Sequence, residues 1–384
     1  MSKTNPAAPV EQVNAKIEQT LYLAFELSRK KWKLAFSDGR TRRARIVTIG
    51  AQDWEALDRE VERARVRFDL SNGAPVRSCY EIGREGFWLH RAVIRRGIEN
   101  VVVDAASIEV NRRQRRAKTD RMDAEKLVEQ LMRYARGERR VWSVVRVPEE
   151  AAEDARQLHR DIGVLTRERT QHHNRIQALL FAQGIDMAVN SRFLQQLPGL
   201  RRWDGGRLPA GLEQRLIREY QRWQAVEMDL RQLRKQQEEK LKTERSAAIK
   251  KVARLQQLRG IGMRSSWMLV MELFGWRQFN NRREVAGAVG LAPTPYQSGE
   301  SQREQGISRS GNRRVRAMTI EISWAWLRFQ PNSELSCWYR KRFGGGGARM
   351  RKIGIVALGR RLVIALWRYL EQGTVPAGAR LKTC

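Results

Sequence analysis

The order of apolar runs in residues 1–148 limits most strongly how this chain can fold. Three strand-like runs come first, and the basic SRKK between the first two has the length of a tight hairpin turn. Helix-like and strand-like segments then alternate. The predicted elements are strands at 21–28, 31–39 and 43–50, a helix at 53–68, a strand at 76–83, a helix at 84–97, a strand at 99–105 and a helix from about 120 to 136. This order predicts an α/β domain with a mixed, hairpin-bearing sheet that is flanked by helices.

The same order is that of an RNase H-like α/β domain, which we predict for residues 19–148. Residues 149–257 differ, because charged residues dominate there and apolar ones recur at helical spacing. That pattern predicts a long α-helical coiled-coil region, formed either by two antiparallel helices or by a coiled coil that joins protomers. Residues 1–18 are predicted to be disordered.

Residues 258–384 are predicted to form a mainly α domain. Residues 260–262, Gly-Ile-Gly, stand between two helical segments and resemble a helix-hairpin-helix turn, whose backbone N–H groups bind a DNA phosphate. Residues 286–318 are rich in Gly, Ser and Arg and are predicted to be a long irregular segment, which is uncommon between helices unless it is functional. Residues 351–371 are predicted to be a core helix, because two arginines in its middle argue against a membrane span.

The charge of the chain indicates a polyanionic partner. Lys and Arg number 74 against 42 Asp and Glu, which gives a formal net charge of +32 that is spread along the chain. Such a surface attracts nucleic acid at long range. No apolar run reaches the ~20 residues of a membrane span, the N-terminal residues have no secretory pattern, and three scattered cysteines fit a reducing cytoplasm.

Four carboxylates fall where a metal-dependent phosphoryl-transfer site in an RNase H-like sheet needs them. Glu26 interrupts the first strand, and Glu81 ends a later one. Asp120 and Asp123 begin the helix after the last strand, three residues apart and so on one helical face. Converging carboxylates can hold paired metal ions that stabilise the attacking and leaving oxygens. Structural explanations also exist: a solvent-facing strand position for Glu26, a strand end for Glu81, and an acidic first helical turn for the two aspartates.

A basic run stands directly before Asp120. We predict that it holds a nucleic-acid backbone beside the metal, because cations offset the repulsion between DNA and a carboxylate cluster. The residues of this run are Arg112, Arg113, Arg115, Arg116 and Lys118. A second arginine group in the C-terminal region is predicted to bind backbone phosphates as well: Arg303, Arg309, Arg313, Arg314 and Arg316.

Two signatures in the right order resemble the DEDD transposases of the insertion sequence 110 family. The first is the carboxylate series with KTDRMDAEKL around its last two members. The second is GLAPTPYQSGESQREQGISRSGNRRVR, which is similar to a GLxPxxxxSG segment followed by a basic GNRxxR helix start. The resemblance covers residues from about 20 to 375.

This resemblance implies a recombinase guided by a structured bridge RNA, with a RuvC-like N-terminal domain, a coiled-coil middle and a C-terminal transposase domain. It implies that Ser298 attacks a DNA phosphodiester and forms a phosphoserine link, while Glu26, Glu81, Asp120 and Asp123 of a partner subunit bind Mg²⁺ (or Mn²⁺). Target and donor DNA and a homo-oligomer, a dimer or a synaptic tetramer, are the implied partners. A cytoplasmic, nucleoid-associated protein of a prokaryote is the implied setting.

The sequence departs from the family pattern at the first strand, where Glu26 replaces the usual aspartate. Asp38 is a possible substitute, although SDG favours a turn. The serines that compete with Ser298 in the same segment are Ser301, Ser308 and Ser310. Two alternative functions stay open: a metal-dependent junction resolvase or nuclease that needs no serine, and a non-catalytic nucleic-acid chaperone.

Overall fold

The computed structural model of the protein describes residues 19–41, 43–108, 120–298 and 301–382. Side chains are not described for residue 106, residue 120, residues 295–298 and residues 301–305. The predicted disordered N-terminus and the basic run at 112–118 therefore lie outside the described residues. The chain divides into two compact units, one that ends at Val147 and one that begins at Pro148.

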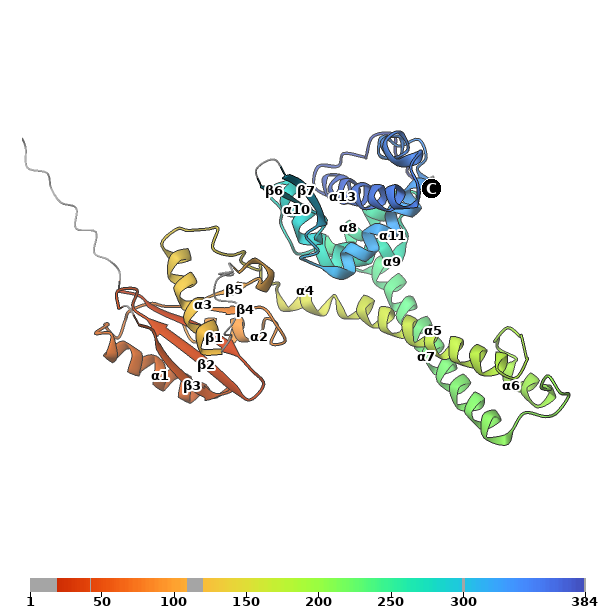
Figure 1. Ribbon diagram of the computed structural model, residues 1–384, viewed down its shortest axis with the longest axis horizontal. Coiled ribbons are helices and arrows are strands. Elements are labelled where there is room, and N and C mark those ends of the chain that lie inside the picture. Colours follow the sequence, from red (N-terminus) through yellow and green to blue (C-terminus); the bar gives the residue numbers. More distant parts are fainter. Residues whose placement is uncertain (1–18, 42, 109–119, 299–300, 383–384) are drawn as a thin grey trace, which may run out of the picture. The chain divides into compact units, whose positions relative to one another are not determined.

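The first unit contains a five-stranded mixed sheet with the strand order β3-β2-β1-β4-β5 (Figure 1). Its strands are β1 (Leu21–Leu27), β2 (Lys31–Ser37), β3 (Arg45–Gly50), β4 (Val76–Glu81) and β5 (Glu99–Val103). The first three strands form an antiparallel meander, whereas β4 pairs in parallel with β1 on one side and with β5 on the other. The predicted mixed α/β sheet is thus confirmed, while its assignment to the RNase H-like folds stays a prediction.

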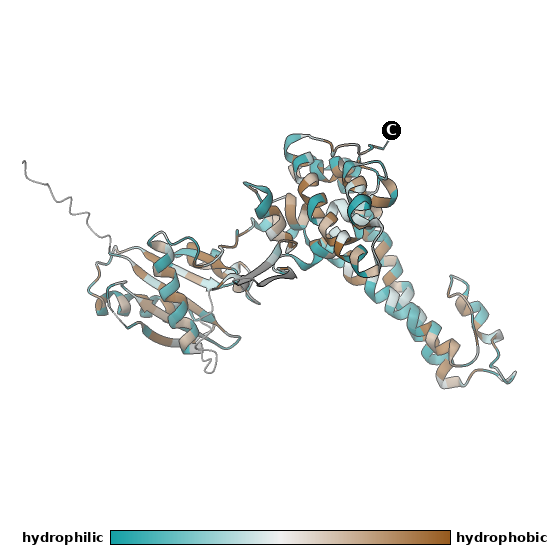
Figure 2. Cartoon of the chain, turned by 45° about the horizontal axis from the view of Figure 1, so that its top comes forward, coloured by the Kyte–Doolittle hydropathy of each residue, from teal (hydrophilic) through white to brown (hydrophobic). Residues whose placement is uncertain are grey.

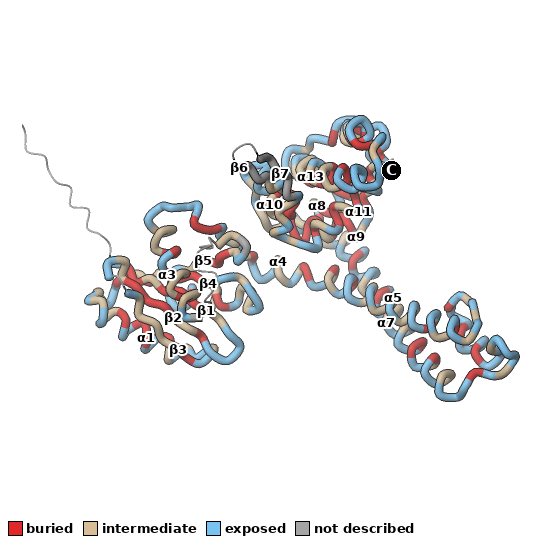
Figure 3. Tube along the Cα trace, in the orientation of Figure 1, coloured by how far each residue is buried: buried red, intermediate tan, exposed pale blue. Residues whose placement is uncertain are grey.

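Both faces of the sheet are buried by helices. Leu21, Leu23 and Phe25 of β1 belong to a core that also contains residues of α1 (Trp54–Arg67) and α2 (Trp88–Ile94). On the opposite face, Ala24 packs with residues of α3 (Asp120–Ala135). The central strands are accordingly buried and hydrophobic along most of their length (Figures 2 and 3). A carboxylate in such a strand needs a position near its end, where burial is incomplete.

The second unit begins with a helical hairpin. Its elements are α4 (Glu150–Asp154), α5 (Gln157–Phe181), α6 (Phe193–Gln196), η3 (Leu197–Gly199) and α7 (Ala210–Thr243). The ion pairs Arg169–Glu227 and Arg175–Glu219 join α5 to α7 in reversed order along the chain, so the two helices are antiparallel. Of the two predicted arrangements, the described chain therefore shows a pair of helices within one protomer, whereas a coiled coil between protomers stays a prediction.

The remainder of the second unit is mainly helical. It comprises α8 (Ala247–Gln256), α9 (Met263–Leu269), the π-helix η4 (Val270–Phe274), α10 (Arg282–Val289), β6 (Pro293–Ser298), β7 (Ser301–Ile307), α11 (Arg313–Phe329), α12 (Glu334–Tyr339), the π-helix η5 (Arg340–Gly344) and α13 (Ala348–Gln372). Residues of α8, η4, α10, α11 and α13 share one hydrophobic core. No helix within the described ranges is long and apolar enough to cross a membrane.

The prediction of an irregular segment at 286–318 was wrong. Residues 293–298 and 301–307 pair as a two-stranded antiparallel ribbon, and helices continue up to Val289 and again from Arg313. Two residues, the first of them glycine, separate the strands in the sequence, and this is the commonest connection length of a β-hairpin. The high Gly and Ser content obscured that signal.

Candidate functional site

Glu26 and Glu81 lie next to each other in the first unit, at the carboxyl ends of the parallel strands β1 and β4. We call this end of the sheet the carboxylate edge. The parallel pairing of β1 with β4 ends at Phe25 opposite Tyr80, and the two glutamates are the next residues of their strands. Since neighbouring strands are about 4.8 Å apart, the two carboxylates start from adjacent backbone positions. Glu26 is partly buried, whereas Glu81 is exposed.

Both glutamates are directed toward the face of the sheet that α3 covers. Side chains alternate along a strand, so Glu26 shares a face with Ala24, and Glu81 shares a face with Cys79. Ala24 and Cys79 both pack in one cluster with residues of α3, among them Leu127. The two glutamates therefore stand on the face that α3 covers, just beyond this cluster toward the carboxyl ends of β1 and β4.

The direction of α3 brings its first turn to the same edge. Cys79 Sγ lies 3.7 Å from the Leu127 carbonyl, while Met132 Sδ lies 3.2 Å from Ser37 Oγ, near the amino end of β1. The helix thus runs from the carboxyl edge of the sheet toward the amino end of β1. Asp123 stands four residues before Leu127, about 6 Å along the helix, which matches the roughly 6.6 Å from Cys79 to Glu81.

The described side chains show an open arrangement and not a closed metal cage. Within the described ranges, no three His, Cys, Asp or Glu side chains come close enough to hold a metal ion. Asp120 begins α3 one turn from Asp123, but its side chain is outside the description. Carboxylate oxygens of this kind are the donors that Mg²⁺ prefers, so Glu26, Glu81 and Asp123 fit a hard divalent cation in donor chemistry.

Asp38 does not substitute for Glu26. Ser37 pairs with Tyr22 near the start of β1, so Asp38 lies about five residues, or roughly 16 Å, from Glu26 along the strand. Its carboxylate accepts backbone hydrogen bonds from Thr41 at 2.7 Å and Arg40 at 3.1 Å. Partial burial alone would raise the pKa of Asp38, but these hydrogen bonds hold it below its usual value. Asp38 therefore stabilises its own turn.

Asp104 is a carboxylate near this edge that the sequence interpretation missed. It follows β5 directly, and the preceding residue, Val103, pairs with Glu81. Asp104 is partly buried, and its backbone carbonyl accepts a hydrogen bond from Ser107 Oγ at 2.7 Å. An acidic residue immediately after a buried strand was the available signal, as it was for Glu81.

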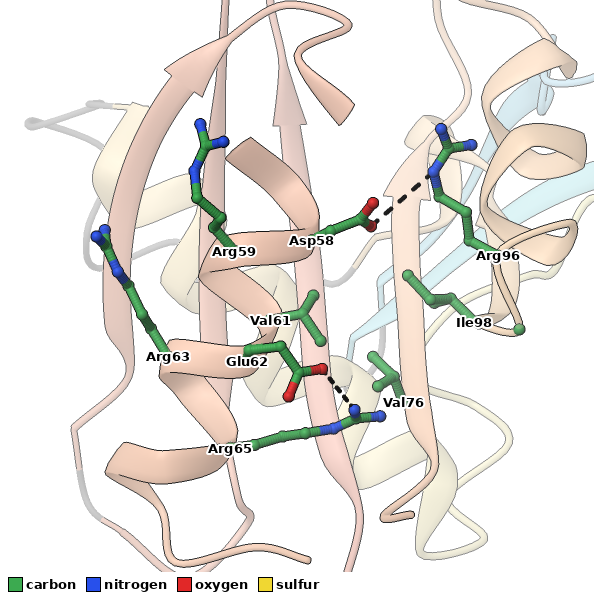
Figure 4. Close-up of a pocket in the computed structure, with 10 residues that line it drawn as sticks. Asp58, Arg59, Val61, Glu62, Arg63, Arg65, Val76, Arg96 and Ile98 are labelled. Carbon is green, nitrogen blue, oxygen red and sulfur yellow. Dashed lines mark hydrogen bonds and ion pairs between the residues drawn. The ribbon is translucent and has the colours of Figure 1, made fainter. Parts of the chain in front are cut away.

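The pocket described in the first unit is separate from the carboxylate edge (Figure 4). It has a volume of about 530 Å³ and is lined by α1, by the start of β4 at Val76 and by Ile98 before β5. It therefore opens at the amino ends of the parallel strands. Its arginines face acidic neighbours, with Arg65 at 2.7 Å from Glu62. We assign no chemistry to it.

Ser298 lies at the far end of the β6–β7 ribbon. It pairs with Ser301 in the last described rung before the connection between the strands. The competing Ser308 and Ser310 lie at the other end, where their hydroxyl groups are 3.1 Å apart. Ser298, the predicted nucleophile, therefore lies at the opposite end of the ribbon from two of the three alternative serines. The side chains of Ser298, Ser301 and Arg303 lie outside the described residues.

Two glycines fix the base of the ribbon. Gly290 ends α10 with φ +71°, and a Cβ atom there would lie 1.8 Å from the Ser310 carbonyl. Gly311 has φ +84°, and its Cβ would lie 2.4 Å from the Ala288 carbonyl. Only glycine combines this backbone conformation with such close packing. The chain before β6 is therefore held tightly against the chain after β7.

A buried carboxylate organises the same region. Glu272, on the π-helix η4, is 1% exposed and accepts hydrogen bonds from His159 Nε2 at 3.0 Å and from Arg160 at 2.8 and 3.0 Å. It also accepts one at 3.0 Å from Nδ2 of Asn312, whose Oδ1 caps α11. π-Helical turns are frequent at functional sites. Glu272 thereby ties α5 and the start of α11 to the core beneath the ribbon.

The electrostatics of Glu272 follow from its partners. Burial alone would raise its pKa, but the hydrogen bonds from His159 and Arg160 outweigh burial and hold the pKa well below its usual value. The sequence interpretation missed this residue, because nothing in MELF distinguishes a buried glutamate from an exposed one.

The arginines predicted to contact phosphates have different environments. Arg309 and Arg313 are exposed. Arg314 is half exposed and lies 3.6 Å from Glu272. Arg316 is partly buried and donates to the backbone carbonyls of Val289 at 3.1 Å and Ser310 at 3.3 Å, so it stabilises the base of the ribbon.

Replacing Glu272 with glutamine should destabilise the protein by about 3–5 kcal/mol, because it removes the countercharge of the partly buried Arg160 and weakens the hydrogen bond from the buried His159. Denaturant unfolding at neutral pH measures the loss. Since the folded-state pKa of Glu272 is lowered, its contribution is fully present above the ordinary value of 4.5 and disappears only as the pH falls through the lowered pKa.

The matched control is Glu321→Gln. Glu321 lies in the same unit, 3.6 Å from Arg264, and both side chains are more than half exposed. Its replacement should cost at most about 1 kcal/mol. Equal losses for the two variants would show that the Glu272 network does not support the unit.

The sequence is similar to one known protein family and to several transposases. Residues 252–336, from α8 through the ribbon into α12, match the family described as Transposase IS116/IS110/IS902. The y4rJ protein of Sinorhizobium fredii, whose name classes it with transposases, is 38% identical over 379 residues, which cover 94% of this chain and 95% of that protein. The transposase for insertion sequence element IS1328 of Yersinia enterocolitica is 24% identical over 57% of this chain and 63% of its own length. The transposase for IS1111A of Coxiella burnetii is 26% identical over 56% of this chain and 58% of its own length.

Proposed function

Because the chain belongs to the IS116/IS110/IS902 family of transposases, we propose that it is an RNA-guided DNA recombinase of an insertion sequence that cuts and joins DNA through Ser298. A structured guide RNA, target and donor DNA and further copies of the chain are the proposed partners. The proposal includes a RuvC-like first domain and an active site that takes Ser298 from one protomer and carboxylates from another.

The observation that carries the proposal is the meeting of three elements at one sheet edge. Glu26, Glu81 and the first turn of α3 with Asp123 share one face and one end of the sheet. If each of these acidic residues had only a structural role of its own, the three would not need to lie at the same end of the sheet. A common end of the sheet is where metal-dependent phosphoryl transfer would draw its carboxylates together, and this supports the proposed metal role of these residues.

The proposed reaction begins at the Ser298 hydroxyl. Its Oγ attacks a DNA phosphorus, a P–Oγ bond forms, and the bond from phosphorus to one nucleoside oxygen breaks. The serine proton leaves Oγ, and the released oxygen is protonated to a free hydroxyl. The hydroxyl of another strand then attacks the same phosphorus and releases Ser298. One phosphodiester bond is exchanged for another, so the reaction needs no nucleotide cofactor.

The surrounding residues have supporting roles in this proposal. Divalent Mg²⁺ or Mn²⁺, held by Glu26, Glu81, Asp120 and Asp123, would supply charge stabilisation at the phosphate. Exposed Arg309 and Arg313 beside the ribbon would hold backbone phosphates in place. Residues 112–118 would do the same near Asp120.

A junction resolvase or nuclease is the alternative. It would use the same carboxylates and would cleave DNA without a covalent intermediate. Membership in a transposase family supports strand exchange over cleavage alone, because transposition requires that the cut strands be joined again. The two are distinguished by the serine substitution described in the Discussion.

Expression of the protein together with its native flanking DNA should yield one discrete structured RNA after purification. Sequencing of the bound RNA measures this, and the RNA should map beside the reading frame. Mixed cellular RNA that dissociates at moderate salt, as nonspecific complexes do, would contradict the guided mechanism.

A further inference from the structure

The connection at the tip of the α5–α7 hairpin presents an exposed aromatic side chain. A tight loop there is closed by an isolated β-bridge between Arg201 and Arg207. Trp203, inside this loop, is 80% exposed. A tryptophan side chain usually buries 150–250 Å², so a loop that exposes one so fully gives up a large apolar contribution. This exposure leaves nearly the whole indole available for contact with another molecule.

Several hydrogen bonds hold this loop together. Arg202 N–H donates to the Gly206 carbonyl at 2.8 Å, and Gly205 N–H donates to the Arg202 carbonyl at 2.9 Å. The Asp204 carboxylate accepts from Gly206 N–H at 3.0 Å and from the Arg202 guanidinium at 2.6 Å. These polar groups of the loop thus find hydrogen-bond partners within it. Trp203 is therefore exposed on a hydrogen-bonded turn.

The backbone of Trp203 is fixed to the end of α5. Its N–H donates to the Gln183 carbonyl at 3.0 Å. Gly184 has φ +75°, and a Cβ atom there would lie 2.9 Å from Trp203 Cβ. The glycine therefore admits the tryptophan backbone against the helix end and leaves the indole outside. Phe181, whose carbonyl accepts from Gly184 N–H at 3.0 Å, is 74% exposed.

The charge around the indole favours a polyanion over a second copy of the chain. Arg201 and Arg207 are exposed, and with Arg202 they outnumber the single carboxylate of Asp204. Two such loops would repel each other, whereas a phosphate backbone would be attracted. Aromatic rings between cationic residues are typical of proteins that bind single-stranded nucleic acid, where bases stack on the rings.

We propose that Trp203 stacks on an unpaired base of the bound nucleic acid, with Arg201 and Arg207 contacting the adjacent phosphates. The proposal rests on the proposed function for its class of ligand. It requires neither Ser298 nor the carboxylates, because stacking is a binding step. A duplex offers no free base face, so the contact selects single strands, loops or bulges.

The test compares full-length Trp203→Ala, Trp203→Phe and unaltered protein in binding to three probes: oligoadenylate RNA, oligodeoxyadenylate and a fully paired DNA duplex. The alanine variant should bind the single-stranded probes about 5- to 100-fold more weakly and the duplex equally well, since each stacked base contributes about 1–3 kcal/mol. The phenylalanine variant should retain most of the affinity. The RNA and single-stranded DNA probes show which strand the tip prefers.

A probe with one 2-aminopurine gives a second readout. Its fluorescence should be quenched by the unaltered protein and should recover with Trp203→Ala. Met228→Ala is the control, because Met228 on α7 is 67% exposed and apolar but has no ring. An equal loss on duplex and single strands, or no loss at all, would overturn the proposal. So would a changed oligomeric state with unaltered affinities, which would assign the indole to contacts between copies.

These outcomes are separate from a failure of the proposed function. The probes are synthetic and the assay scores no strand transfer. A chain that carries no guide RNA can still show the stacking contact, and a guided recombinase can lack it.

Discussion

Ser298→Ala is expected to abolish strand transfer, by at least about 10⁴-fold, while DNA and RNA binding persist. Removal of a nucleophile eliminates the step that forms the covalent bond, and such losses are among the largest seen in enzymes. Ser298 pairs in the last described rung of the ribbon, far from the packed base. The substitution should therefore leave the fold intact, which thermal unfolding can confirm.

The assay follows recombination between donor and target DNA together with the covalent adduct. Unaltered protein should give a protein–DNA band that survives denaturing electrophoresis, and Ser298→Ala should give none. Ser301→Ala is the control, because Ser301 stands opposite Ser298 in the same rung and is expected to retain activity. Undiminished recombination by Ser298→Ala would reject the serine mechanism and favour the resolvase alternative.

Asp123→Ala is expected to abolish cleavage as well, by about 10³-fold or more, and to weaken metal binding. Asp123 stands one turn before Leu127, on the helix that covers the face carrying Glu26 and Glu81. Loss of one ligand from a carboxylate site leaves the phosphate charge without part of its stabilisation, which is often the largest catalytic contribution. Nucleic-acid affinity should be retained.

Glu129→Ala is the matched control for Asp123→Ala. Glu129 lies on the same helix and is exposed, and its replacement by alanine removes the same charge. Cleavage in Mg²⁺ or Mn²⁺ and titration calorimetry with Mn²⁺ are the two measurements. Equal activity of the two variants would show that α3 contributes no metal ligand, and full activity of Asp123→Ala would favour a binding protein without catalysis.

The strand pattern predicted most of the first unit because burial there follows sequence closely. Three meander strands and two parallel strands need apolar residues on both faces, and those runs are visible in the sequence. The same logic located Glu26 and Glu81, since a carboxylate in or after a buried strand is conspicuous. The end of the sheet at which each residue lies depends on strand pairing, which the sequence does not reveal. Asp38 is therefore a candidate from the sequence, and the register of β1 and β2 excludes it from the carboxylate site.

The second unit was less predictable because its decisive contacts are distant in sequence. Glu272 meets His159 and Asn312, which are 113 and 40 residues away. The ribbon depends on pairing of polar strands, in which hydrophobic alternation is weak. Trp203 is exposed because of a loop geometry that composition does not reveal.

The length of α7 sets a minimum span for any single ligand that contacts both ends of this helix. Its 34 residues at 1.5 Å each extend about 50 Å, the span of roughly 15 base pairs at 3.4 Å per step. Trp203 precedes this helix, whereas the β6–β7 ribbon belongs to the unit's core beyond its other end. A single ligand that contacts both regions must span about this distance, so short oligonucleotides should engage only one of the two regions at a time.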